Sequence, residues 1–283
     1  MKKYYLFIAL AMVAAMTVSC KNNNKKAAKT AEANAEVVEA AKTILTDDVL
    51  ATLDEIAKPI LESSGSAAPE SIIASALTEE EKLIKPDYLL EASQANEMVT
   101  KSQKLNALAI LFVERPIRIA YGMPTEETDK VIAHLAAEVN DPISFDDEMN
   151  LTPAEKTKMA YEAHKERGDI TDFWQYVFAI QIEINYLISN NPDAFFRNLT
   201  EEQYQSFHNR YVSCLKAVKE LAKYDSEIAL ILDTYYKYND FSNFEDGVNA
   251  YGTMADGKRL AVESKDIYEA KRAAFLGQDL QQQ

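Results

Sequence analysis

Apolar residues recur every three or four positions along most of the chain, which is the period of an amphipathic α-helix. No comparable stretch alternates apolar and polar residues between turn signals, so the pattern does not support a β-sheet. Segments of helical period cover residues 46–62, 70–84, 87–121, 126–139, 153–167, 170–189, 200–223, 225–238 and 255–276. The sequence therefore predicts an all-α fold, an irregular bundle of about nine helices that forms a single domain over residues 43–283.

Helix-start signals and composition agree with this prediction. Capping boxes occur at Thr78/Glu81, Thr152/Glu155, Thr200/Gln203 and Ser242/Glu245, and Pro153 and Pro192 stand at first helical positions. The 283 residues include only 7 Gly and 8 Pro, so few of the tight turns that an antiparallel sheet needs can form. The pattern is interrupted at residues 142–151. We interpret this interruption as a loop over a continuous core, with a division into two domains as the alternative.

The first twenty residues have the pattern of a secretion signal. Lys2 and Lys3 precede an apolar run from Tyr4 to Val18, and a polar stretch begins at Lys21. The run is shorter than the roughly 20 apolar residues that a membrane-spanning helix needs. The pattern therefore favours a cleaved signal peptide over a permanent membrane segment.

Residues 17–20, Thr-Val-Ser-Cys, resemble the lipobox of bacterial lipoproteins, in the looser form ending in Ser-Cys that is familiar in the Bacteroidetes. The resemblance implies that residues 1–19 are removed and that Cys20 carries the lipid that anchors the protein to the outer membrane. Residues 20–42 would then be the lipidated cysteine and a flexible tether. Surface-exported relatives of this kind carry acidic residues just after the cysteine, and residues 21–26 contain none, which implies a protein facing the periplasm. The alternative is an ordinary signal peptide cut elsewhere.

The charge of the chain excludes one large class of partner. Acidic residues outnumber basic ones 45 to 30, and residues 43–283 alone carry a net formal charge of −19. Proteins bind phosphate backbones mainly through Lys and Arg, so this acidic surface repels nucleic acid.

Arg118 is the first candidate for a ligand-binding residue. It lies among Ile117, Ile119 and other apolar residues on a helix that the pattern predicts to be central. A buried guanidinium there can bind a carboxylate or phosphate group. Glu114 stands four residues earlier, so we favour the alternative, an ion pair within the helix.

Aromatic residues supply two further candidate sites. Trp174, the only tryptophan, lies among Gln181, Glu183 and Asn185 on one predicted helix and could line a small-ligand cleft. Tyr235, Tyr236 and Tyr238 lie near Asp and Asn residues, a composition suited to binding a glycan or a peptide. For the Trp174 set we favour a helix boundary that is wet at one edge, and for the tyrosines we favour packing against neighbouring helices.

No motif indicates catalysis, a cofactor or a metal site. The three histidines His134, His164 and His208 do not have metal-ligand spacing, and the sequence contains no P-loop, nucleophile elbow or dinucleotide fingerprint. Cys214 lies in an apolar helical pattern, so we predict a core residue. The sequence therefore predicts no enzyme, no cofactor and no metal.

These features together favour a lipid-anchored cell-envelope protein with a non-catalytic binding or assembly role. The membrane, through the N-terminal lipid, and an envelope protein are the expected partners. Two alternatives stay open: a small-ligand or glycan-binding periplasmic lipoprotein that uses an aromatic cleft, and an unrecognised hydrolase. The sequence does not determine the ligand, the partner or the oligomeric state.

Overall fold

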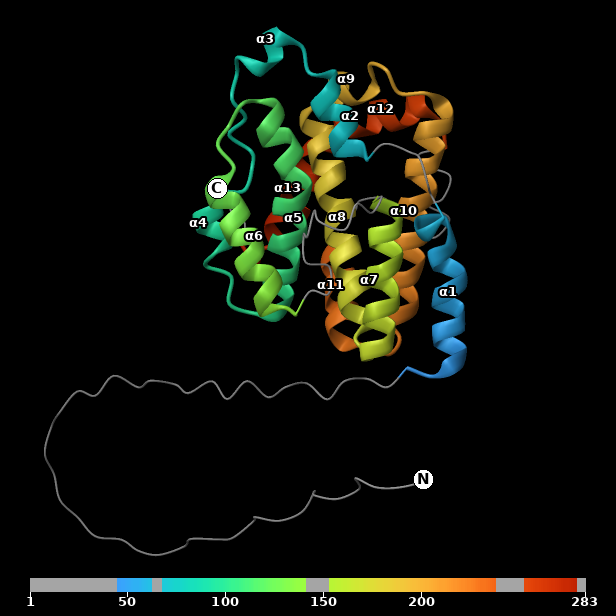
Figure 1. Cartoon of the computed structure of the whole chain (residues 1–283). Coiled ribbons are helices and arrows are strands. Elements are labelled where there is room, and N and C mark those ends of the chain that lie inside the picture. Colours follow the sequence, from blue (N-terminus) through green and yellow to red (C-terminus); the bar gives the residue numbers. More distant parts are fainter. Residues whose placement is uncertain (1–44, 63–67, 141–152, 238–251, 279–283) are drawn as a thin grey trace, which may run out of the picture. The chain divides into compact units, whose positions relative to one another are not determined.

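The computed structural model describes residues 45–62, 68–140, 153–237 and 252–278, and within these ranges the protein is all-α (Figure 1). The described residues form thirteen helices and no β-strand. The helices are α1 (Asp47–Leu61), α2 (Pro69–Ala76), α3 (Glu79–Lys82), α4 (Ala92–Ala95), α5 (Lys101–Ala120), α6 (Glu126–Glu138), α7 (Pro153–Arg167), α8 (Ile170–Asn190), α9 (Pro192–Phe196), α10 (Glu201–Leu221), α11 (Ser226–Lys237), α12 (Met254–Glu263) and α13 (Lys265–Phe275). The predicted fold class is confirmed.

The predicted number of about nine helices was too low, because breaks inside apolar stretches do not interrupt the apolar period. The stretch 70–84 divides at Leu77, whose extended backbone ends α2. The stretch 87–121 divides at Thr100, which caps α5 in a capping box with Gln103. Ser264, which is buried, separates α12 from α13. The fourth helix beyond the predicted nine is the short α9, which begins at Pro192, a predicted helix start.

Threonine caps start several helices as the sequence predicts. The side chains of Thr78 and Thr200 each accept a hydrogen bond from the backbone N–H three residues on, and the side-chain oxygens of Glu81 and Gln203 accept one from the backbone N–H of the cap residue. Such a cap contributes about 1 kcal/mol by satisfying backbone N–H groups that the first helical turn leaves free. The predicted boxes at Thr152 and Ser242 and the interruption at 142–151 lie outside the described residues.

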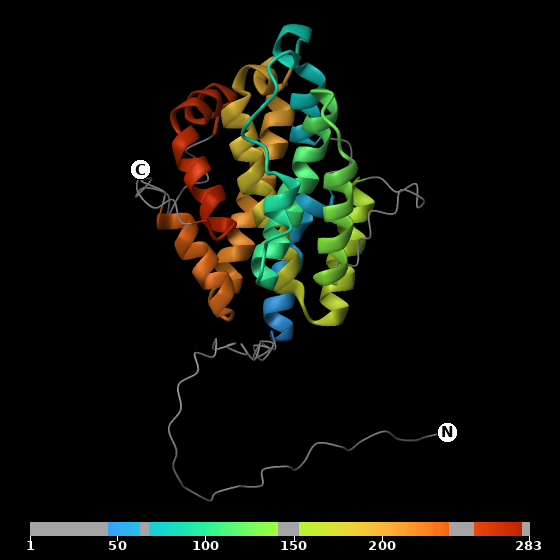
Figure 2. The same cartoon turned by 90° about the vertical axis from the view of Figure 1, so that its left-hand side faces the viewer.

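Helix α8 is the central element of the body (Figures 1 and 2). It contacts α2, α5, α7, α9, α10, α12 and α13. Its sequence is apolar around most of its circumference, as a helix surrounded by other helices requires. Helix α5, for which the sequence predicted a central position, packs against α8 and carries the exposed residues Phe112 and Ile119 on its outer face.

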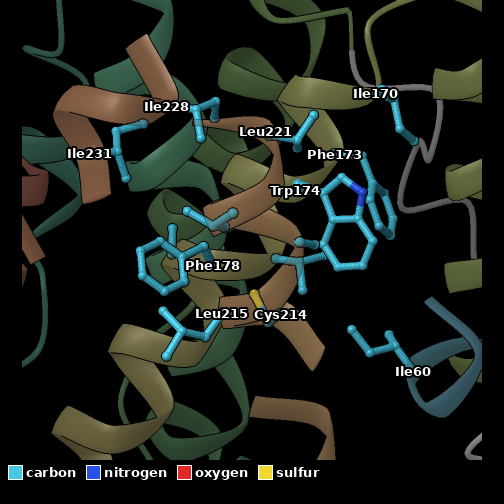
Figure 3. Packing of buried hydrophobic residues seen from close by; sticks show 14 of the residues in the cluster. Ile60, Ile170, Phe173, Trp174, Phe178, Cys214, Leu215, Leu221, Ile228 and Ile231 are labelled. Atoms are coloured by element: carbon cyan, nitrogen blue, oxygen red, sulfur yellow. The ribbon is translucent and has the colours of Figure 1, made fainter. Parts of the chain in front are cut away.

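The largest apolar cluster joins α8 to α1, α10 and α11 (Figure 3). Trp174 and Phe178 of α8 and Cys214 of α10 are completely buried in it. Burial raises the pKa of the Cys214 thiol well above its usual range, so this cysteine is an inert core residue, as predicted. None of the helices in the described ranges combines the length and the apolar character that crossing a membrane requires.

Candidate functional site

Four charged side chains meet inside the body, where α5, α8 and α13 pack together. Glu114 and Arg118 come from α5, Glu183 from α8 and Arg272 from α13. The side chains of both glutamates are 0% exposed, and those of Arg118 and Arg272 are 5% and 12% exposed. Ionised side chains are this deeply buried only when partners offset the loss of water. We call these four residues the buried charge cluster.

Arg272 joins the two carboxylates of the cluster. Its Nε donates to Glu183 Oε2 at 2.7 Å, and its Nη2 donates to Glu114 Oε1 at 2.5 Å. The guanidinium also lies over the ring of Tyr186, 4.7 Å from the ring centroid. One cation thus holds α13 to both α5 and α8 through charge-assisted hydrogen bonds, the stronger kind of hydrogen bond in proteins.

Glu114 and Arg118 together hold a length of non-helical backbone. The Leu90 N–H donates to both Glu114 oxygens, at 2.9 and 2.8 Å, and Arg118 Nη2 donates to the Leu90 carbonyl. The two side chains also contact each other, Nη2 to Oε2, at 3.4 Å. A buried peptide group outside regular structure needs such partners. The pair therefore fixes the connection between α3 and α4 against α5.

Burial and the neighbouring charges shift the pKa values of two members of the cluster, Glu183 and Arg272. Burial raises the pKa of Glu183 to about 8, Arg272 opposes this rise, and the nearby Glu114 carboxylate adds to it. Burial alone would lower the pKa of Arg272, but Glu183 and Glu114 outweigh burial and raise it. Two atoms, Arg118 Nε and Glu183 Oε1, have no hydrogen-bond partner. Glu183 is therefore a carboxyl group that keeps its proton near neutral pH.

The hydrogen bonds of the cluster have a structural role, because they join separate segments of the chain. Most of the polar atoms of the cluster bond to one another or to Leu90. A general acid or nucleophile must contact its substrate, whereas these side chains are closed off in the interior. The cluster explains how α13 and the α3–α4 connection are held in place.

The structure separates the residues that the sequence proposed as sites. Arg118 pairs with Glu114, as we favoured, and binds a carbonyl of its own chain. Trp174 is completely buried in the apolar cluster, and its Nε1 has no hydrogen-bond partner. Its position is therefore in the core and not at a solvent-filled cleft.

Two of the candidate tyrosines, Tyr235 and Tyr236, lie on α11, whereas Arg118 lies on α5. Tyr235 is buried, its hydroxyl pairs with that of Tyr211, and its ring packs against Tyr236 with centroids 5.5 Å apart. Tyr236 is half-buried. Tyr238, like Cys20, lies outside the described residues.

Sequence reasoning missed Arg272 and Lys271, two adjacent basic residues of α13 that are both buried. Lys271 Nζ lies 3.8 Å from the centroid of the Tyr235 ring, and burial lowers the pKa of Lys271 to about 7. In the sequence, both residues look like exposed positions on a helix near the end of the chain. The one sign that they are buried is that the apolar residues Ala273 and Phe275 lie within the next few positions.

Within the part of the chain that the structure describes, one group of side chains has ligand atoms close enough together for a metal ion. His164, Asp169 and Asp172 place one ligand atom each within 4.8 Å of the others. Arg167 bonds to Asp169 at 3.2 Å, and Lys101 bonds to Asp172 at 2.5 Å. These two cations already balance both carboxylates. The sequence did not reveal the group because it spans the junction between α7 and α8.

A shallow, open groove lies between α1 and α10. Its volume is about 390 Å³. The residues that line it are Pro59, Glu62, Glu202, Gln205, Ser206 and Asn209. It is therefore distinct from Arg118, Trp174 and the tyrosines.

Comparisons with known proteins add no functional information. No protein-family model matches the chain, and neither curated proteins nor solved structures give a significant match. The functional argument therefore depends on the geometry alone.

Proposed function

We propose that this protein is a lipid-anchored component of the bacterial outer membrane, facing the periplasm, that binds another envelope protein without catalysing a reaction. The apolar run Tyr4–Val18 and the lipobox-like segment ending at Cys20 support the anchor. The closure of the buried charge cluster supports a non-catalytic role. The observation that carries the binding role is a pair of exposed aliphatic residues beside α3.

Leu83 and Ile84 are adjacent and are 81% and 78% exposed. Most large aliphatic side chains bury themselves on folding, at a gain of about 1.5–3 kcal/mol each. Single exposed aliphatic residues need no explanation, but two neighbours that both point into solvent form a contact surface. We call residues 83–84 the apolar tip.

The chain holds the apolar tip in place from both sides. On one side, Arg197 binds both Glu81 oxygens, at 2.7 and 3.1 Å, and the Ala76 carbonyl. This pairing lowers the pKa of Glu81 to about 2. On the other side, Lys85 Nζ donates to the Tyr121 carbonyl, and further along the buried charge cluster holds Leu90. A surface fixed in this way loses little entropy on binding.

The position of the apolar tip and the charges around it favour a protein partner. The tip follows α3, at the opposite end of the helical body from the start of α1 (Figures 1 and 2). The tether proposed here joins the body near that start. Glu79 and Glu80 are exposed beside the tip. Lys82 pairs with Glu79 at 2.8 Å, so the acidic group that anionic lipid would repel is Glu80. The partner surface should therefore be an apolar pocket with a basic rim.

The test is the size of the native complex in detergent extracts of cell membranes. We expect the double variant Leu83→Ser, Ile84→Ser to release the protein from a larger complex on native gels, with the melting temperature unchanged because both side chains are exposed. Leu230, 67% exposed on α11, provides the matched control Leu230→Ser, which should leave the complex intact. Equal migration of the double variant and the wild type would contradict the proposal.

A further inference from the structure

One face of α1 and one face of α10 line the groove between these helices, which pack side by side (Figure 1). Pro59 and Glu62 stand three positions apart at the end of α1. The residues from α10 follow the helical period and are Glu202, Gln205, Ser206 and Asn209. None of these six residues is basic, and two of them are glutamates.

The end of α1 adds negative charge to the groove. Glu62 is the C-cap residue of α1. The last carbonyls of a helix have no partners within it, and they give this end a partial negative charge. Pro59 has no N–H, so it cannot bond to the Glu55 carbonyl one turn earlier, which is a further acceptor. This end of the groove therefore favours a hydrogen-bond donor with a positive charge.

The two carboxylates of the groove have no cation of their own. Glu62 and Glu202 are both exposed, and neither forms an ion pair with any residue that the structure describes. Lys58, one turn before Glu62, is bound to Glu55 at 2.5 Å. The body as a whole, with a net formal charge of −19 over residues 43–283, attracts cations from a distance. A positively charged partner therefore complements the groove.

The open shape of the groove favours a segment of protein chain over a small molecule. Small-molecule sites usually enclose most of their ligand, whereas a single cation in this shallow groove would keep most of its water. An extended segment can add contacts to its backbone. Asn209 is exposed, and its amide can both donate to and accept from a peptide group. Gln205 Nε2 already donates to Glu201 at 3.1 Å and to the Gly252 carbonyl at 2.7 Å, so the Gln205 oxygen is the atom that can accept from a peptide N–H.

We infer that the groove between α1 and α10 binds a basic segment of another protein. Lys or Arg side chains of that segment pair with Glu62 and Glu202, and the negative end of α1 adds to the attraction. Asn209 and Gln205 bond to the backbone of the segment. The groove shares no residue with the apolar tip, so this inference does not depend on the partner proposed there.

The test is the fluorescence anisotropy of dye-labelled hexalysine titrated with the purified full-length protein. The salt concentration is about 0.15 M, at which exposed charges more than about 8 Å apart are largely screened. We expect saturable binding, and binding at least about fivefold weaker for the double variant Glu62→Gln, Glu202→Gln, which removes both ion pairs. The matched control is Glu126→Gln, Glu127→Gln, which removes two exposed carboxylates from the start of α6 and should change the affinity less than about twofold.

Thermal melts establish that each variant is folded, which we expect because all four carboxylates are exposed. No saturable binding of hexalysine would overturn the inference. An equal loss of affinity in the two double variants would overturn it as well, because the attraction would then come from the acidic body as a whole.

Other ligands test the identity of the occupant. Hexaglutamate should not bind. Spermine and Ca²⁺ carry positive charge without a peptide backbone, so both should bind more weakly than hexalysine. Asn209→Ala should weaken hexalysine binding by about threefold and leave spermine binding unchanged. If spermine or Ca²⁺ binds through Glu62 and Glu202 as tightly as hexalysine does, the occupant is a small cation and the inference of a protein segment is wrong.

Discussion

Replacing Arg272 with methionine should destabilise the protein more than the same change at Arg118. Arg272→Met removes the hydrogen bonds to Glu183 and Glu114, and breaking a buried ion pair in this way typically costs about 3–5 kcal/mol. Glu183, whose pKa is raised to about 8, already holds a proton at pH 7, so the cost lies at the low end of this range. We therefore expect a loss of about 3 kcal/mol.

Arg118→Met has a smaller expected cost because Glu114 keeps its other partners. Glu114 still accepts from the Leu90 N–H and from Arg272, and the main loss is the bond to the Leu90 carbonyl. An unsatisfied buried carbonyl costs about 1–3 kcal/mol, so the expected loss is about 2 kcal/mol. If Arg118 were the sole partner of Glu114, Glu114→Gln would rescue Arg118→Met. Because Arg272 and Leu90 also bind Glu114, we expect little rescue.

The free energy of unfolding, measured by urea denaturation at pH 7, tests this order. Arg259→Met, which alters an exposed pair with Glu263, is the control and should change stability by less than about 1 kcal/mol. The double variant Arg272→Met, Glu183→Gln should recover part of the loss, because it removes the buried carboxyl group that has lost its bond to Arg272. If Arg118→Met proves as costly as Arg272→Met, or more so, Arg272 is not the residue that holds the cluster together.

Three further predictions follow from the structure and the sequence. Because Glu183 has a folded-state pKa of about 8 against an ordinary value of 4.5, it releases its proton more readily in the unfolded chain. Stability should therefore fall as the pH rises from about 5 to 8, by a few kcal/mol, and Glu183→Gln should remove most of this fall in urea denaturation at several pH values. Cys20→Ala should abolish incorporation of labelled fatty acid, and undiminished labelling would refute the lipid anchor. Arg197→Gln should speed tryptic cleavage after Lys82 up to about fivefold, because an exposed pair contributes up to about 1 kcal/mol; unchanged cleavage would show that Arg197 does not hold α3.

Local patterns in the sequence predicted the helices and one ion pair because those features depend on near neighbours. Thr78 and Thr200 start helices through residues three positions on, and Glu114 meets Arg118 one turn away. The same rule marks Thr100 with Gln103, but the apolar period across residues 87–121 concealed that break.

The remaining features of the site depend on contacts between distant segments. Arg272 reaches Glu114 and Glu183 only because α13 packs on α8, and no spacing in the sequence indicates this packing. Trp174 also shows this limit. Its polar neighbours on α8 suggested a cleft or a wet helix edge, but helices surround α8 and Trp174 lies in the core. Leu83 belonged to a predicted helix, and only the structure reveals its exposure.

Site-specific photo-cross-linking in intact cells tests the central claim, that the apolar tip contacts a protein partner, most directly. A photoreactive residue would replace Ile84 in one strain and Leu230, an exposed residue of α11, in another. We predict one discrete protein adduct from position 84 and none of that mass from position 230, with the adduct lost when Glu79 and Glu80 are both changed to lysine. No adduct at position 84, or the same adduct from both positions, would contradict the claim.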